Sequence, residues 1–143
     1  RIEIWKYGIS QALNHPFFGT GASSFPEMFR AQTGLWKGHS HNLPLELIIS
    51  YGIPAGFFII FPICLISYRS INTIFFTKLK FKNYIFDRAW ITSLIVLLIS
   101  QMVDVQYFDG RISIILWILL SGARNMINEQ KYKIKREAES LKK

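Results

Sequence analysis

The sequence predicts an all-α integral membrane protein, a helical bundle with about three transmembrane helices that follow a helical loop outside the bilayer. Half of the 143 residues are apolar, and they gather in long blocks whose flanks carry the cations. Blocks of this kind match the roughly 20 apolar residues that cross a bilayer. Cations beside such blocks are typical of cytoplasmic loops. The net charge of +8 therefore indicates a membrane-lipid environment and no nucleic-acid partner.

Residues 1–44 are predicted to form the loop outside the bilayer, with short helices. Apolar residues within 1–14 recur at the spacing of one helix face. The stretch HPFFGTG (15–21) is predicted to turn, because proline disfavours helix in the residue before it and glycine permits tight turns. Ser24 is the expected cap of a short helix that runs through Arg30.

Residues 45–127 are predicted to be the transmembrane region, with spans at about 45–68, 87–108 and 111–127. The first has 24 residues and would extend about 36 Å as one helix. Its two internal prolines are compatible with a span, since neighbouring helices satisfy the freed carbonyls. The third run is short, and a re-entrant half-helix is the alternative to a full crossing.

The distribution of cations predicts the topology. Residues 1–44 hold four Lys or Arg, the connector 69–88 holds five in 20 residues, and 124–143 holds seven in 20. The positive-inside rule then puts the connector and the basic tail (128–143) in the cytoplasm and the opening loop outside. Three crossings give this arrangement.

The polar loop that enters the first span carries the candidate chemistry. His41 could accept a proton near neutral pH, although a loop histidine is more often simply solvated. His39 and His41 could hold zinc only with a third ligand, and the sequence has no HExxH motif. It has no DxD pair and no nucleophile elbow either, so neither metal-bridged nucleotide-sugar chemistry nor Ser-His-Asp catalysis is indicated.

The motifs resemble those of the O-antigen ligase and polymerase family. His41-Asn42, nine residues, and then Gly52-Ile53-Pro54-Ala55 is similar to that family's HN-x9-GxxG signature, with Ala55 in place of the last glycine and Gly56 beside it. Arg1, Trp5 and the turn 15–25 resemble its Arg-x3-Trp and PxxGxG stretch. Asp104, before the final apolar run, fits its C-terminal pattern. The resemblance extends over residues 1 to about 127.

The resemblance implies a multi-spanning inner-membrane glycosyltransferase that moves a glycan from undecaprenyl diphosphate to lipid A core or a similar acceptor, with residues 1–44 in the periplasm. Arg1 would bind the diphosphate, and His41 would activate the acceptor hydroxyl or stabilise the leaving group. Asn42, Arg30 and His39 would contact the substrate. Neither a metal nor another cofactor is expected.

Two alternatives remain open at this stage. A polymerase of the same family would use the same motif with another acceptor. A transporter or transport accessory protein would place ionisable residues at the bilayer midplane, whereas the centres of the three predicted spans are uncharged. Because the chain opens in mid-pattern, we expect it to be the C-terminal part of a longer protein, with the remaining N-terminal helices as partners and little activity by itself.

Overall fold

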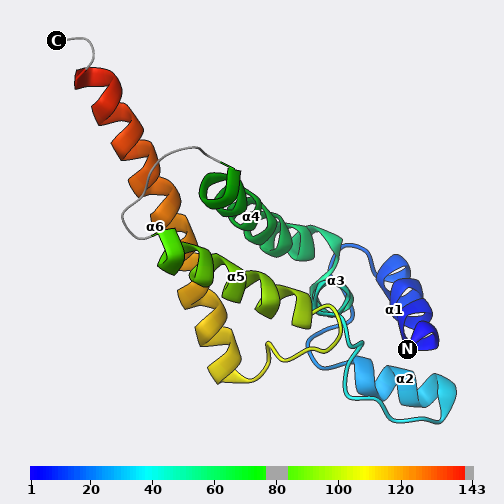
Figure 1. The fold of residues 1–143 in the computed structure, drawn as a ribbon. Coiled ribbons are helices and arrows are strands. Elements are labelled where there is room, and N and C mark those ends of the chain that lie inside the picture. The colour runs from blue at the N-terminus through cyan, green and yellow to red at the C-terminus, as the bar shows by residue number, and fades with distance from the viewer. Residues whose placement is uncertain (77–83, 141–143) are drawn as a thin grey trace.

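The predicted all-α class is confirmed. A computed structural model describes residues 1–76 and 84–140, and this part of the chain is helical without strands (Figure 1). The predicted connector cations Lys78, Lys80 and Lys82 lie outside the described residues. The helices in chain order are α1 (Ile2–Asn14), α2 (Phe25–Thr33), α3 (Leu43–Tyr51), α4 (Ile53–Ile71), the π-helical turn η1 (Asn72–Phe76), α5 (Tyr84–Ser100) and α6 (Gly110–Ser140).

Three long helices, α4, α5 and α6, form the body of the molecule, and α1, α2 and α3 gather at one end of it (Figure 1). Helix α6 packs against both α4 and α5. The core between them is made of apolar side chains that are almost completely buried: Ile74, Ile91, Leu94, Leu116, Leu120 and Ala123. Gly122 lets α6 approach α5, because a Cβ there would lie 2.5 Å from the Trp90 ring.

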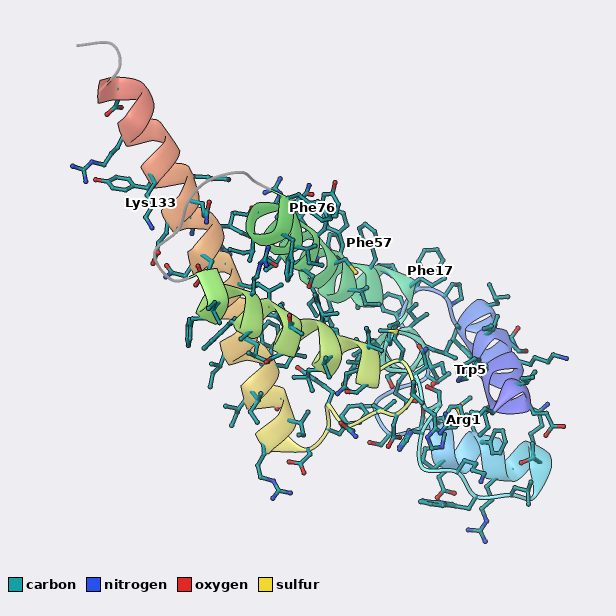
Figure 2. The ribbon with its side chains drawn as sticks, in the orientation of Figure 1. Arg1, Trp5, Phe17, Phe57, Phe76 and Lys133 are labelled. Atoms are coloured by element: carbon teal, nitrogen blue, oxygen red, sulfur yellow. The ribbon has the colours of Figure 1, made fainter. Side chains whose placement is uncertain are left out.

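The outer surface of this bundle is apolar. Two helical segments, Ile53–Phe76 and Gly110–Lys133, are long and apolar enough to cross a membrane. Phe57 and Phe58 are 55% and 74% exposed, and Figure 2 shows Phe57 and Phe76 on the outside of the bundle. Exposed side chains of this size suit contact with lipid. Helix α5, with 17 residues, is shorter, and its crossing stays a prediction.

The first predicted span, 45–68, is not one helix. It is divided at Gly52, whose backbone angles of φ 87° and ψ 167° end α3 and start α4 in a new direction. The predicted turn 15–21 packs into this break: Thr20 N–H donates to the Ile49 carbonyl at 2.8 Å, and Ile53 N–H donates to the Pro16 carbonyl at 2.7 Å. These bonds satisfy backbone groups that a helix break would otherwise leave unpaired.

The ends of the other two long helices also differ from the expected limits. Helix α5 stops at Ser100 rather than near 108, because the buried Gln101 side chain accepts the backbone N–H groups of Gln106 and Tyr107 and closes a compact turn. Helix α6 continues past 127 to Ser140, so the predicted tail begins as an extension of the last apolar helix. The good helix formers of the basic segment explain this continuation.

Candidate functional site

The polar loop 38–42 is held in place by the start of α3. Asn42 is the N-cap residue: its Oδ1 accepts the Leu45 N–H at 3.0 Å, and Pro44 lies in the first helical turn. The other end of the amide is also engaged, since Nδ2 donates to the Met102 carbonyl at 3.3 Å. Leu43 N–H donates to the Gln101 carbonyl at 2.9 Å. The loop is therefore joined to the turn that follows α5.

Ser40, between the two histidines, is fully buried, and its backbone hydrogen bonds hold the loop in place. Its N–H donates to Glu46 Oε2 at 2.8 Å, and its carbonyl accepts the Trp5 indole N–H at 3.0 Å. Glu46 is itself 2% exposed, so this hydrogen bond is shielded from water. Because a buried backbone group is costly to leave unpaired, these two bonds fix the position of Ser40 and the directions of its neighbours.

The side chains of His39, His41 and Asp104 meet above this buried loop. His41 Nδ1 lies 3.1 Å from Asp104 Oδ1, and His39 Nε2 lies 3.6 Å from the same oxygen. The two rings touch edge to face with centroids 4.3 Å apart. His41 has a left-handed backbone (φ 55°), which is uncommon for a residue other than glycine and often marks a functional position. Its N–H donates to His39 Nδ1 at 3.2 Å.

The histidines influence the charge state of Asp104. The hydrogen bond with His41 lowers the pKa of the Asp104 carboxyl below its ordinary value, with further lowering from the charge of His39 and the Val105 N–H, against an opposing effect of desolvation. Asp104 is thus a carboxylate at neutral pH. A carboxylate can only accept hydrogen bonds. His41 must therefore carry a proton on Nδ1, and when the ring is neutral its Nε2 has a free lone pair.

The three side chains offer ligand atoms within 4.8 Å of one another, which makes them a candidate metal group. The third ligand that the sequence analysis lacked would be Asp104. The hydrogen bonding does not fit a metal, however. His39 Nδ1 accepts a backbone N–H, so a neutral His39 carries its proton on Nε2, which faces Asp104 and then has no lone pair for an ion. Among the described residues, the cluster therefore joins two imidazole rings to one carboxylate oxygen.

Of the residues predicted for the site, His39, His41 and Asn42 lie in one loop, and the two arginines lie on other elements. Arg1 precedes α1 (Figure 2), and Arg30 lies in the last turn of α2; both are exposed. Among the described residues, the structure gives neither guanidinium a hydrogen bond or ion pair with the histidines. Asp104 was noted in the sequence as part of the family pattern, but its pairing with His41, 63 residues away, was not predicted.

Fold and site together define an integral membrane protein with a cluster of polar groups at one end of a helical bundle. The model of the O-antigen ligase family matches residues 1–60, and this match confirms the resemblance suggested by the motifs. It includes α1, the turn at 15–21, both histidines and Gly52. Over these residues the chain is similar to the O-antigen ligase family. No curated protein and no solved structure matches the chain.

Proposed function

We propose that this chain forms the acceptor-activating part of a glycosyltransferase of the O-antigen ligase type. The observation that carries the proposal is the His41–Asp104 pair, 3.1 Å apart, at the end of an apolar bundle and with His41 inside the matched segment. An imidazole held by a carboxylate is an arrangement that suits a general base. The donor would be a glycan on undecaprenyl diphosphate, and the acceptor lipid A core or another glycan.

In the proposed reaction, an acceptor hydroxyl attacks the anomeric carbon of the donor glycan. A new C–O bond forms, the bond between the sugar and the diphosphate breaks, and the lipid diphosphate leaves with the bond's electrons. The hydroxyl proton passes to His41 Nε2, and Asp104 stabilises the resulting imidazolium across Nδ1. The diphosphate is already a good leaving group, so positioning and charge stabilisation supply the rest. Arg1 and Arg30 are the cations we propose for the diphosphate.

Apolar hollows under the polar loop support a lipid-linked donor. One of about 130 Å³ opens between α3, α4 and α5, and another of about 210 Å³ reaches α6. Leu43, Leu47 and Ile63 line both, and Leu43 directly follows the capping residue Asn42. A hydrocarbon chain in these hollows would lie next to the histidine pair, which suits a donor that combines a polyprenyl tail with a diphosphate.

The observations favour transfer chemistry over transport. The candidate polar groups collect at one end of the bundle, as surface chemistry on a membrane-bound substrate requires, whereas a transporter needs ionisable groups near the midplane. A polymerase would share the same His41 chemistry and differ only in the acceptor. The cation pattern supports a bacterial inner-membrane location with residues 1–44 in the periplasm and the tail in the cytoplasm.

Labelling of single cysteines in intact cells tests the topology that this function needs. The buried Ser40 would not react with a maleimide, so the label for the histidine loop is placed at the exposed Lys37. The label for the tail is placed at the exposed Glu139, and both variants carry Cys64→Ser. Asp109, on the turn before α6, is the matched site at the histidine end. An impermeant maleimide should label Lys37→Cys and Asp109→Cys, and reach Glu139→Cys only after permeabilisation. The reverse pattern would place His41 in the cytoplasm and contradict the proposal.

A further inference from the structure

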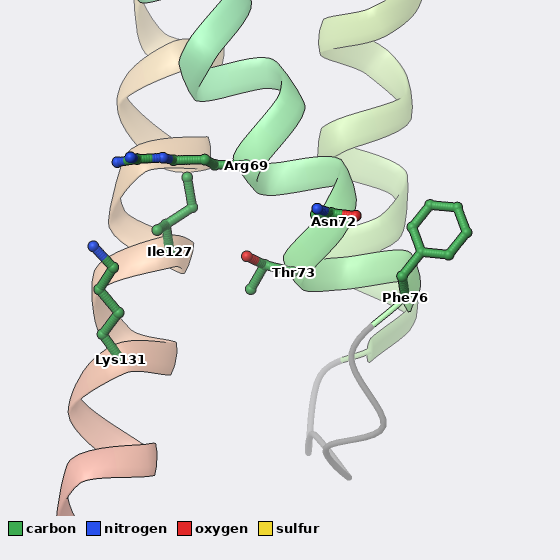
Figure 3. Close-up of a pocket in the computed structure, with 6 residues that line it drawn as sticks. All are labelled: Arg69, Asn72, Thr73, Phe76, Ile127 and Lys131. Atoms are coloured by element: carbon green, nitrogen blue, oxygen red, sulfur yellow. The ribbon is translucent and has the colours of Figure 1, made fainter.

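A polar hollow, distinct from the two apolar ones, lies away from the histidine pair. It has a volume of about 590 Å³ and is situated between the end of α4 with η1 and the middle of α6 (Figure 3). Six residues line it: Arg69, Asn72, Thr73, Phe76, Ile127 and Lys131. The set has two cations, a hydroxyl and an amide, and no carboxylate. Figure 3 shows the Arg69 and Lys131 side chains extending to the same side of the hollow, next to Ile127.

Packing on the opposite side of η1 holds this wall in place. Ile74 is completely buried in the core with Ile91 and Leu94 of α5, and the Arg88 guanidinium lies over the Phe75 ring at 5.2 Å. Thr73 and Phe76, which flank these residues in the π-helical turn, line the hollow instead. Widened turns of this type are frequent at functional sites in helices. The side of the hollow formed by Thr73 and Phe76 is therefore held in place by the packed core.

The hollow lies near the end of the apolar segment Gly110–Lys133 of α6, and the turn that carries Asp104 precedes the start of this segment. Ile127 is 17 residues beyond Gly110, where α6 begins, which corresponds to about 26 Å along the helix. The hydrocarbon core of a bilayer is about 30 Å thick. Phe76 lines the hollow and Tyr68 precedes Arg69 in sequence, and both are exposed, as aromatic residues are at membrane interfaces. If α6 crosses the membrane as the sequence predicts, the two cations would lie at the interface on the other side from His41.

We propose that this hollow, defined by Arg69, Thr73 and Lys131, binds the phosphate of an anionic membrane lipid headgroup. Arginine and lysine bind phosphate oxygens through charge-assisted hydrogen bonds, and the Thr73 hydroxyl can add one more. Phe76 and Ile127 provide apolar contact for the glycerol and the first acyl carbons, which a free phosphate ion would not use. Basic pockets between transmembrane helices on the cytoplasmic side recognise lipid headgroups in this way. The proposal does not depend on the glycosyl-transfer function.

Titration of the purified full protein with phosphatidylglycerol, followed by native mass spectrometry, tests this site. Each cation that contacts the headgroup should contribute to anionic-lipid binding by an amount that corresponds to about 5-fold in affinity. Arg69→Gln and Lys131→Gln should each weaken binding by about 5-fold, and the double variant by about 30-fold. Lys133→Gln is the matched control on α6: it removes the same charge, but Lys133 lies near Asp87 and Glu129 and does not line the hollow. It should change binding by less than about twofold.

Three results would overturn the proposal. Unchanged binding by the double variant would exclude the hollow, and an equal loss in Lys133→Gln would indicate general charge attraction in its place. Inorganic phosphate is the third arm: if it displaces phosphatidylglycerol at millimolar concentration, the site recognises a free anion and not a lipid. Thermal unfolding in phosphatidylcholine alone verifies that the variants are folded, so that a loss of binding reports on the site.

Discussion

Replacing Asp104 with asparagine removes the negative charge beside His41 and keeps the shape of the side chain. Asp104 Oδ1 accepts both the His41 Nδ1–H at 3.1 Å and the Val105 N–H at 3.0 Å. An asparagine oxygen can occupy the same position and accept the same two groups, so the tautomer and direction of the imidazole are retained. The variant therefore isolates the electrostatic contribution of the carboxylate to the imidazolium that forms in the proposed transition state.

The size of the effect follows from the exposure of the pair. A hydrogen bond to a charged group contributes about 1.5–3 kcal/mol. The Asp104 side chain is 48% exposed, so water screens the charge and about 1–2 kcal/mol is the appropriate range. This corresponds to a loss of about 5- to 30-fold in the transfer rate. Asp104→Ala, which also removes the acceptor, should be slower still.

The assay is transfer of a labelled glycan from a polyprenyl diphosphate donor in proteoliposomes. Asp109→Asn is the control: it lies five residues further on in the same turn, pairs with Arg111 at 2.9 Å, and loses the same charge. Its rate should stay within about twofold of the unsubstituted protein. Full activity of Asp104→Asn, or an equal defect in Asp109→Asn, would refute the role assigned to Asp104.

Stability measurements against pH provide a further expectation for the same residue. The pKa of Asp104 is lower in the folded protein than in the unfolded chain. Its contribution to stability is therefore complete above the ordinary carboxyl pKa of about 3.9 and is lost as the pH falls through the lower folded value. The difference in unfolding temperature between the unsubstituted protein and Asp104→Asn should therefore shrink as the pH falls below about 4. A difference that stays constant from about pH 5 to about pH 2 would contradict this assignment.

Two substitutions test the scaffold of the site. Glu46→Ala leaves the buried Ser40 N–H unpaired and should lower the free energy of unfolding by about 1–3 kcal/mol, whereas Glu46→Gln retains an acceptor and should lose less; thermal unfolding in detergent measures both, and equal losses would contradict the hydrogen-bond argument. Gly52→Ala should prevent correct packing, because its Cβ would overlap the Phe17 carbonyl at a backbone φ of 87°. Gly34→Ala, at φ 73° in open space, should cost only about 1 kcal/mol in the same measurement, and similar melting of the two variants would refute the close contact.

The sequence predicted the class of fold well because apolar blocks and flanking cations are local signals. It did not predict the break at Gly52, since a glycine within an apolar run is also compatible with a continuous helix. The break is stabilised by the turn 15–21, which packs against it through backbone bonds to Ile49 and Ser50. Contacts between segments this far apart have no signature in a single sequence.

In the candidate site, too, local features could be predicted from the sequence and long-range contacts could not. The histidine loop was recognisable because a polar HN pair directly precedes an apolar run. The partner of His41 was not, because Asp104 reaches it only after α5 returns to the same end of the bundle and Gln101 closes the turn. The buried acceptor Glu46, which stabilises the loop through the Ser40 N–H, was likewise not predicted from the sequence.

Glycan transfer by His41→Ala in proteoliposomes tests the central claim most directly. His15→Ala is the matched control, since His15 is an exposed histidine in the turn after α1 whose side chain is outside the cluster. Loss of a general base slows a reaction by about 100- to 10,000-fold. The account predicts a loss of at least about 100-fold for His41→Ala and unchanged transfer for His15→Ala. Transfer by His41→Ala at the rate of the unsubstituted protein would contradict the assignment of His41 as the base.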